Sequence, residues 1–182
     1  MTPSTPQAFT PLTPAPSQCS LNAFVAAYGD VFEHSPWIAE QAWREGLDER
    51  HDDPVALAEK MGGVLRAAPV ERQIAVIEAH PDLAGKAALA DELTDASKSE
   101  QAGAGLDQCS PEELSRFESL NGTYKATFGF PFVVAVKGLD RYAILEAFQT
   151  RLDNTPAQER QTAIEQIVRI ARFRLVARTE TT

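Results

Sequence analysis

From Ser20 onward, the hydrophobic positions of this chain recur every three or four residues, which is the period of helices that bury one face. Val70, Ile74 and Ile77 share one such face, for example. This period predicts an all-α fold. The helices are expected at residues 21–28, 36–46, 54–67, 69–79, 97–104, 111–127, 141–152 and 156–177.

Several of the predicted helix starts carry a second signal, a Ser, Thr or Asp followed directly by Pro. The side chain of the first residue can cap free N–H groups, and Pro lacks an N–H that the first turn would leave unpaired. Glu113, three residues after Ser110, completes a capping box. The pairs stand at Ser35-Pro36, Asp53-Pro54, Ser110-Pro111 and Thr155-Pro156.

One stretch, FVVAV at residues 132–136, is β-like and is bounded by Pro131 and Gly138. A single strand cannot form a sheet, so we predict a short extended buried connector. Its main-chain N–H and C=O groups need partners once they are buried. A ligand rich in amide-like groups could supply them, and plain hydrophobic packing is the alternative.

The first 18 residues differ from the rest, because they hold five of the twelve prolines and no charged side chain. We predict a disordered tail there, with a Pro-rich ligand for a partner domain as the alternative. The remaining chain is long enough for one core, since 43% of the 182 residues are hydrophobic. We therefore expect one compact multi-helix domain at residues 19–178 and a short tail at residues 179–182.

Charge and composition exclude several classes of protein. Lys and Arg number 17 against 26 Asp and Glu, and a net charge of −9 argues against a nucleic-acid-binding surface. No apolar run approaches the ~20 residues of a membrane helix. Cys19 and Cys109 match no metal or redox spacing, and no signal sequence is present. We expect a cytoplasmic protein without nucleic-acid or membrane partners.

His80 is the first candidate for chemistry. Pro81 disfavours helical geometry at His80, so the imidazole is expected at a helix C-terminus. The helix macrodipole there favours the protonated form, and such a histidine can act as an acid or base near neutral pH. The alternative is that His80 only caps its own helix.

Two further polar groups stand at unusual positions. Ser97 and Glu100 have capping-box spacing and, with Gln101, surround a helix start that could cradle an anion. Arg174 falls on the apolar stripe of the last helix, three residues after Ala171. A buried guanidinium needs an anionic partner, either a protein carboxylate or a substrate carboxylate.

Signatures of several common enzyme classes are missing. No GxSxG, P-loop or GxGxxG pattern occurs, and the three histidines lack the spacing of a zinc site.

Five segments in series resemble the 2-oxo-4-hydroxy-4-carboxy-5-ureidoimidazoline (OHCU) decarboxylases. Each segment alone would be a weak signal, but together they follow the order and spacing of that family from about Ser20 to about Ala177. The segments are FEHSPW at 32–37, HPDLAG at 80–85, SKSEQAG at 97–103, FGFPFV at 128–133 and RFRL at 172–175.

The resemblance implies an all-helical, cofactor-free, homodimeric carboxy-lyase that converts OHCU to (S)-allantoin and CO2 in urate degradation. His80 matches the catalytic histidine of the family. Glu100, if it lies beside His80, would raise the imidazole pKa and fix its tautomer. The other substrate contacts implied by the resemblance are Pro81, Ser97, Gln101, Phe132, Val133, Val134, Ala135, Val136 and Arg174.

Two other functions stay open at this point. One is a decarboxylase or hydrolase of another small ureido or imidazole acid on the same scaffold. The other is a non-catalytic helical interaction module whose Pro-rich tail recruits partners.

Overall fold

The computed structural model describes residues 10–85 and 92–180, and within this part of the chain it contains helices and no strand. The all-α prediction is confirmed. The α-helices are α1 (Leu21–Tyr28), α2 (Trp37–Arg44), α3 (Pro54–Ala67), α4 (Val70–Glu78), α6 (Asp95–Gly103), α7 (Pro111–Phe128), α8 (Arg141–Arg151) and α9 (Pro156–Glu180). Short 3-10 turns occur at Pro16–Gln18, Glu49–Asp52 and Leu106–Gln108.

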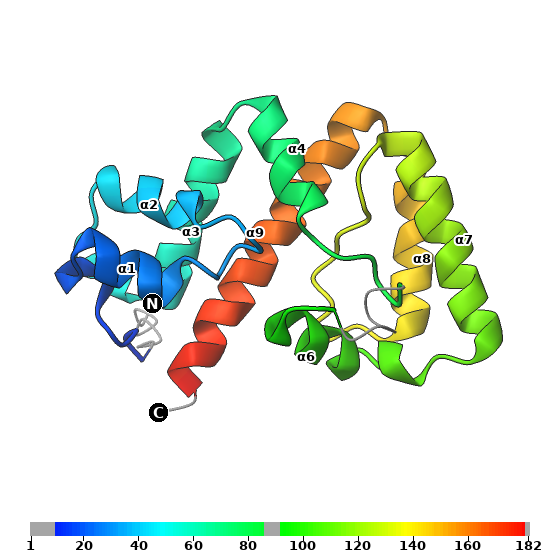
Figure 1. Ribbon diagram of the computed structural model, residues 1–182, viewed down its shortest axis with the longest axis horizontal. Helices are drawn as coiled ribbons and strands as arrows, with labels where there is room; N and C mark the ends of the chain where they lie inside the picture. The colour runs from blue at the N-terminus through cyan, green and yellow to red at the C-terminus, as the bar shows by residue number, and fades with distance from the viewer. Residues whose placement is uncertain (1–9, 86–91, 181–182) are drawn as a thin grey trace, which may run out of the picture.

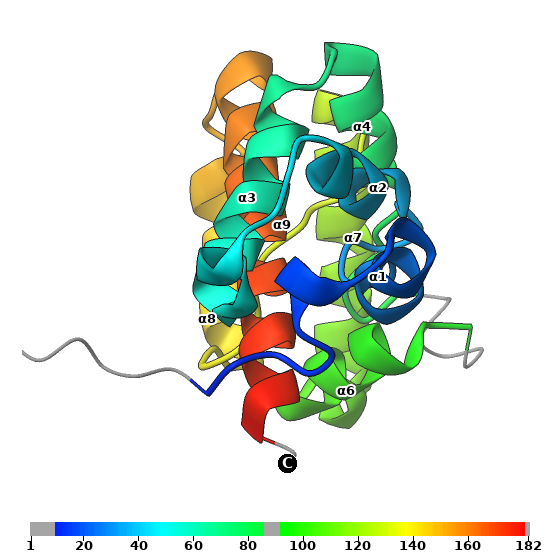
Figure 2. The same cartoon turned by 90° about the vertical axis from the view of Figure 1, so that its left-hand side faces the viewer.

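The long helix α9 runs through the middle of the molecule (Figures 1 and 2). The helices α1 to α3 lie on one side of it and α6 to α8 on the other. Its buried side chains, among them Ile167 and Leu175, belong to the core. Gly62 allows α3 to pack tightly against α9, because a Cβ atom there would lie 2.8 Å from Cγ1 of Val168. Helix α9 therefore carries residues that face both halves.

Most of the predicted caps are present. Asp53 accepts hydrogen bonds from two main-chain N–H groups of α3, and Ser110 and Glu113 form the expected capping box of α7. The Ser35-Pro36 pair behaves differently, because the Ser35 hydroxyl donates to the main-chain oxygen of Glu33 instead of capping α2. That hydrogen bond stabilises the loop before α2, which contributes to the site described below.

The connector at residues 132–136 is buried along its whole length and forms no strand, as expected. Arg151 donates from Nη1 to the Val133 oxygen at 2.5 Å, and the side-chain oxygen of Gln166 accepts from the Ala135 N–H at 3.0 Å. Two of its main-chain groups are thus paired by side chains of α8 and α9.

Glu159 is the buried anchor of this arrangement, with a fully enclosed side chain. Its carboxylate pairs with Arg151 and accepts hydrogen bonds from the Tyr124 hydroxyl at 2.5 Å and the Asn154 amide at 2.8 Å. Because a buried carboxylate is stable only when it is paired and hydrogen-bonded, these contacts lock α7, α8 and α9 together around the connector.

The predicted disorder of the N-terminal segment is wrong for residues 10–18. Leu12 is buried, and its N–H donates to the Asp52 main-chain oxygen at 2.8 Å. The N–H and hydroxyl of Ser17 both donate to the Asp52 carboxylate, and the Tyr28 hydroxyl donates to the Pro14 oxygen. One apolar side chain and these hydrogen bonds hold a segment whose composition alone suggested a tail.

Both predicted tails also extend beyond what the structure describes. Residues 1–9, 181 and 182 lie outside the described residues, whereas Thr179 and Glu180 belong to α9 rather than to a tail. Among the described residues, no helix is long and apolar enough to cross a membrane.

Replacing Leu12 by Ala should lower the free energy of unfolding by about 2–5 kcal/mol, because it empties a buried leucine site. Urea denaturation followed by circular dichroism measures this change. Thr10→Ala, at an exposed position of the same segment, is the control and should change stability by less than about 0.5 kcal/mol. Equal stability of the two variants would contradict the packing of Leu12.

Candidate active site

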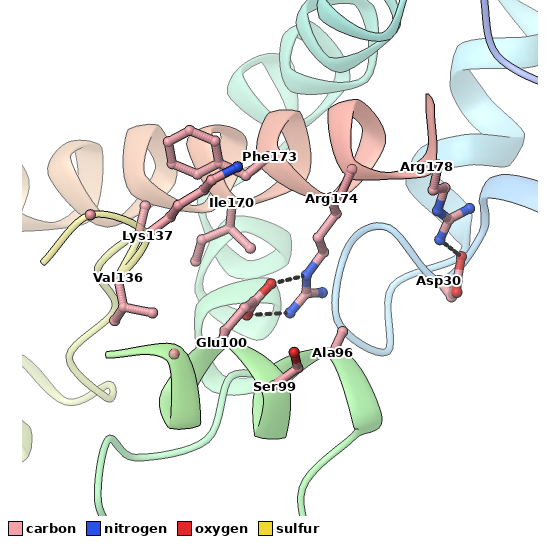
Figure 3. A pocket seen from close by; sticks show the side chains of 14 residues that line it. Asp30, Ala96, Ser99, Glu100, Val136, Lys137, Ile170, Phe173, Arg174 and Arg178 are labelled. Atoms are coloured by element: carbon pink, nitrogen blue, oxygen red, sulfur yellow. Dashed lines mark hydrogen bonds and ion pairs between the residues drawn. The ribbon is translucent and has the colours of Figure 1, made fainter. Parts of the chain in front are cut away.

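Two adjoining cavities lie between α6, α9 and the 132–136 connector, and they share Glu100, Val136 and Ile170 as walls. The outer cavity, drawn in Figure 3, measures about 440 Å³, whereas the inner one measures about 30 Å³. Of the predicted site residues, Ala135 and Arg174 line the outer cavity and all the others line the inner one. Residues from distant parts of the sequence are thus brought together.

His80 follows the end of α4 and is buried at the wall of the inner cavity. Its Nδ1 lies 2.9 Å from the Val76 main-chain oxygen. A carbonyl oxygen can only accept, so this hydrogen bond requires a proton on Nδ1 and leaves Nε2 as a proton acceptor. The fold therefore fixes the tautomer through the main chain of His80's own helix.

Burial lowers the pKa of His80 to about 4, even though the hydrogen bond to Val76 and the charge of Glu33 act in the opposite direction. The charges of Arg174 and His34 lower it further. The expectation that the helix C-terminus would favour a protonated imidazole is wrong, because desolvation of a nearly enclosed ring outweighs the dipole. His80 is neutral at physiological pH.

Helix α6 begins two residues earlier than predicted, and its cap is Thr94, whose side chain accepts from the Ser97 N–H. Ser97 is therefore free to donate its hydroxyl hydrogen bond to Glu33 at 3.1 Å. Gln101 fixes the loop after His80, because its amide group pairs with the Ala84 N–H and the Asp82 oxygen. The capping-box interpretation of Ser97 and Glu100 is wrong.

Arg174 reaches from α9 into the space between α6 and the loop before α2, and its side chain is 8% exposed. Its Nε and Nη2 donate to the two oxygens of Glu100 at 2.7 and 3.0 Å, a bidentate fork visible in Figure 3. Its Nη1 donates to Glu33 at 2.9 Å and to the Val31 oxygen at 3.3 Å. The guanidinium is thus shared by two carboxylates.

The two carboxylates differ in accessibility. The Glu33 side chain is 2% exposed and that of Glu100 is 30% exposed. Burial alone would raise the pKa of Glu33, but hydrogen bonds from Thr94 and Arg174 and the Arg174 charge hold it below its usual value. For the Arg174 guanidinium, burial acts to lower the pKa, and the contacts with Glu100 and Glu33 raise it.

Sequence reasoning missed Glu33. The carboxylate whose charge acts on the His80 pKa is Glu33, whereas Glu100 is paired with Arg174, so the role foreseen for Glu100 in raising the imidazole pKa falls to Glu33. The sequence did hold a signal, because Glu33 directly follows two apolar residues, Val31 and Phe32. The structure buries both almost fully. An acidic residue in such a run requires a buried partner.

The connector offers unused main-chain groups. Within the described residues, the peptide groups of Phe132 and Val134 have no hydrogen-bond partner, although both residues are buried and line the inner cavity. Buried N–H and C=O groups are almost always paired, so these are available to a ligand. Together with the neutral imidazole and the guanidinium, they suit a small polar ligand with amide-like edges.

The described part of the chain holds no group of three His, Cys, Asp or Glu side chains that could bind a metal ion.

Comparison with known proteins gives consistent matches. A model of the OHCU decarboxylase family matches residues 17–176. The OHCU decarboxylase of Haloferax volcanii is 40% identical over 157 residues, which cover 86% of this chain and 89% of that protein. The enzyme of the same name from Halalkalicoccus jeotgali is 38% identical over 159 residues, 87% of this chain and 86% of that protein.

A crystal structure of (S)-allantoin synthase superimposes on 90% of this chain with a TM-score of 0.68 and 29% sequence identity. This chain covers 52% of that protein, so it spans about half of its length.

The imidazole of His80 should stay neutral, with the proton on Nδ1, from pH 8 down to about pH 5, because burial places its pKa at about 4. Two-dimensional ¹H–¹⁵N NMR of labelled histidines during a pH titration measures both the pKa and the tautomer. A midpoint at or above 6.5 would contradict the burial argument. Since the native pKa lies below the unfolded value of about 6.5, His80 should also reduce stability as the pH falls from about 6.5 to 4.

Proposed function

The chain belongs to the OHCU decarboxylase family, and we propose that it converts OHCU to (S)-allantoin and CO2 with His80 as the catalytic residue. The family and its relatives, which include a uric acid degradation protein of Bacillus subtilis, make it a decarboxylase of urate degradation. The observation that carries the residue assignment is a buried neutral imidazole whose Nε2 is a proton acceptor at the wall of the inner cavity.

The substrate supplies its own electron sink. OHCU carries a carboxylate and a hydroxyl on one ring carbon, next to a C=N bond. When the bond to the carboxylate breaks, its electron pair moves into the C=N group and CO2 leaves. The nitrogen of the former C=N group takes up one proton, and a C=C bond now joins the two ring carbons. The hydroxyl then loses its proton to become a carbonyl, and the carbon that bears the ureido group gains a proton. These last two steps cancel, so one proton is taken up for each CO2 released. This chemistry requires proton transfer and orientation rather than a redox or carbanion-stabilising cofactor.

His80 is suited to the proton transfers. A neutral imidazole with its acceptor nitrogen at the cavity wall can take the hydroxyl proton as a general base. The resulting imidazolium would be stabilised by the nearby Glu33 charge. It can then deliver a proton to the ring carbon, and delivery from one face yields a single enantiomer. Glu100 lines the same cavity, and we propose it as the second catalytic residue beside His80.

Arg174 is proposed to bind the substrate carboxylate or a carbonyl edge. In the structure its N–H groups all donate to protein acceptors, but the Glu100 side chain that accepts from Nε and Nη2 is 30% exposed and so is the more accessible of its two carboxylate partners. A substrate carboxylate has the same bidentate geometry and can take the place of Glu100 on this fork. The inner cavity of about 30 Å³ holds one or two waters at most. A ureidoimidazoline therefore extends into the outer cavity, toward Arg174.

The remaining polar groups are proposed to bind the ring and ureido amides. Ser97 and Gln101 line the inner cavity with Pro81, and so do Phe132 and Val134, whose peptide groups are unpaired. Backbone and side-chain amides that fix several edges of the substrate supply orientation, which accounts for a large part of the rate. We also propose that the protein is a homodimer that works in the cytoplasm, as the resemblance and the sequence suggest.

Replacing His80 by Asn should lower kcat by about 10²- to 10⁴-fold with little change in KM, because Asn cannot accept the proton at the position of Nε2. OHCU is unstable, so it is generated in the cuvette from urate by urate oxidase and hydroxyisourate hydrolase. Circular dichroism then follows the formation of enantiomerically pure allantoin.

His51→Asn is the matched control, since His51 lies in the Glu49–Asp52 turn outside both cavities. Slow racemic product from well-folded native protein would refute the proposed function. Near-native activity of His80→Asn would refute only the role of His80.

Replacing Arg174 by Ala should raise KM by roughly 10- to 100-fold, because a charge-assisted bidentate contact contributes about 1.5–3 kcal/mol. The same variant should be less stable, since it leaves Glu33 buried without its cation. Initial rates with enzymatically generated OHCU measure KM, and a thermal melt measures stability. Arg172→Ala, on the exposed side of the same helix, is the control. An unchanged KM in folded Arg174→Ala would contradict the assignment.

A further inference from the structure

The Glu33 carboxylate is the point at which three separate parts of the fold meet. Its Oε1 accepts hydrogen bonds from the Thr94 hydroxyl at 2.6 Å and the Ser97 hydroxyl at 3.1 Å, both at the start of α6. Its Oε2 accepts from Arg174 of α9 at 2.9 Å. Glu33 itself lies in the loop between α1 and α2. One buried side chain therefore sets the position of α6 relative to α9.

The loop that carries Glu33 is held in an uncommon conformation. His34 has a φ of 48°, in the left-handed region that non-glycine residues seldom occupy. The loop is fixed on both sides of this residue, because the Ser35 hydroxyl donates to the Glu33 oxygen and Arg174 donates to the Val31 oxygen. Backbone strain that is maintained by several contacts is typical of functional sites.

Glu33 lines neither cavity, which places it behind the residues proposed to bind the substrate. Its exposure also separates it from Glu100, since a carboxylate that is 2% exposed cannot leave its cation without a large desolvation cost, whereas one that is 30% exposed can turn to water. When a ligand takes the place of Glu100, Glu33 is the carboxylate that remains on Arg174.

We propose that Glu33 is a positioning residue of the decarboxylation: it keeps the Arg174 guanidinium and the Ser97 hydroxyl in place while the ligand occupies the fork that Glu100 vacates. This inference rests on the proposed function for the identity of the reaction. The way in which the carboxylate orders Arg174, Ser97 and α6, and the effect of its charge on His80, do not depend on which reaction is catalysed.

The test is Glu33→Gln, which keeps the size of the side chain and removes the charge. The expected result is a loss of about 100-fold in kcat/KM, mainly through KM, because a misplacement of about 1 Å at a binding group costs that much. Affinity for racemic allantoin, measured by calorimetry, should weaken in parallel. The His80 pKa, measured by NMR, should fall below the native value, since Glu33 is a charge that raises it, whereas Arg174 and His34 lower it.

Leu57→Ala is the matched control, because it removes a fully buried side chain from α3 and touches neither cavity. It should lower the melting temperature and leave kcat/KM, allantoin affinity and the His80 pKa at their native values. Glu33→Asp keeps the charge with a shorter reach. It should therefore recover part of the lost kcat/KM, and its His80 pKa should lie closer to the native value than that of Glu33→Gln. It also serves as the test variant if Glu33→Gln does not fold.

The outcomes are distinguishable. If the Glu33 variants lose only thermal stability, as Leu57→Ala does, Glu33 is structural and the inference is wrong. If native protein does not decarboxylate OHCU, the proposed function fails, but allantoin affinity and the His80 pKa still decide whether Glu33 positions Arg174.

Discussion

One guanidinium shared by two carboxylates is the interaction on which the site depends. Arg174 of α9 pairs with Glu33 of the loop before α2 and with Glu100 of α6. Because Arg174 and Glu33 are largely removed from water, their charges are stable only while the two groups stay paired, whereas Glu100 remains partly exposed. The pairing therefore joins three segments that are far apart in the sequence, and it holds Glu100, which lines both cavities.

A second buried ion pair stabilises the other side of the site. Glu159, near the start of α9, holds Arg151 of α8, which in turn binds the oxygen of Val133. Helix α9 thus carries an ionic anchor in each half, Glu159 for the connector and Arg174 for α6. The rigid helix between them sets the spacing between the connector and α6, and so the width of the cavities.

Burial away from water also determines the chemistry of His80. Desolvation keeps the imidazole neutral, and the hydrogen bond to Val76 places the proton on Nδ1. The charges that act on the ring come from Glu33, Arg174 and His34. A general base must be unprotonated before it accepts a proton, and the neutral imidazole meets this condition at pH 7.

The sequence by itself determined the helices and most of their ends, because the period of apolar residues and caps such as Ser110 with Glu113 are local properties. The five segments in series, with the residues that they carry, identified the family. Only the tertiary structure decided which charges meet. It buried Leu12 in a segment that resembles a tail, paired Glu100 with Arg174 instead of His80, and lowered the His80 pKa. Burial and ion pairing depend on residues that are distant in the sequence, and local patterns carry no information about those distances.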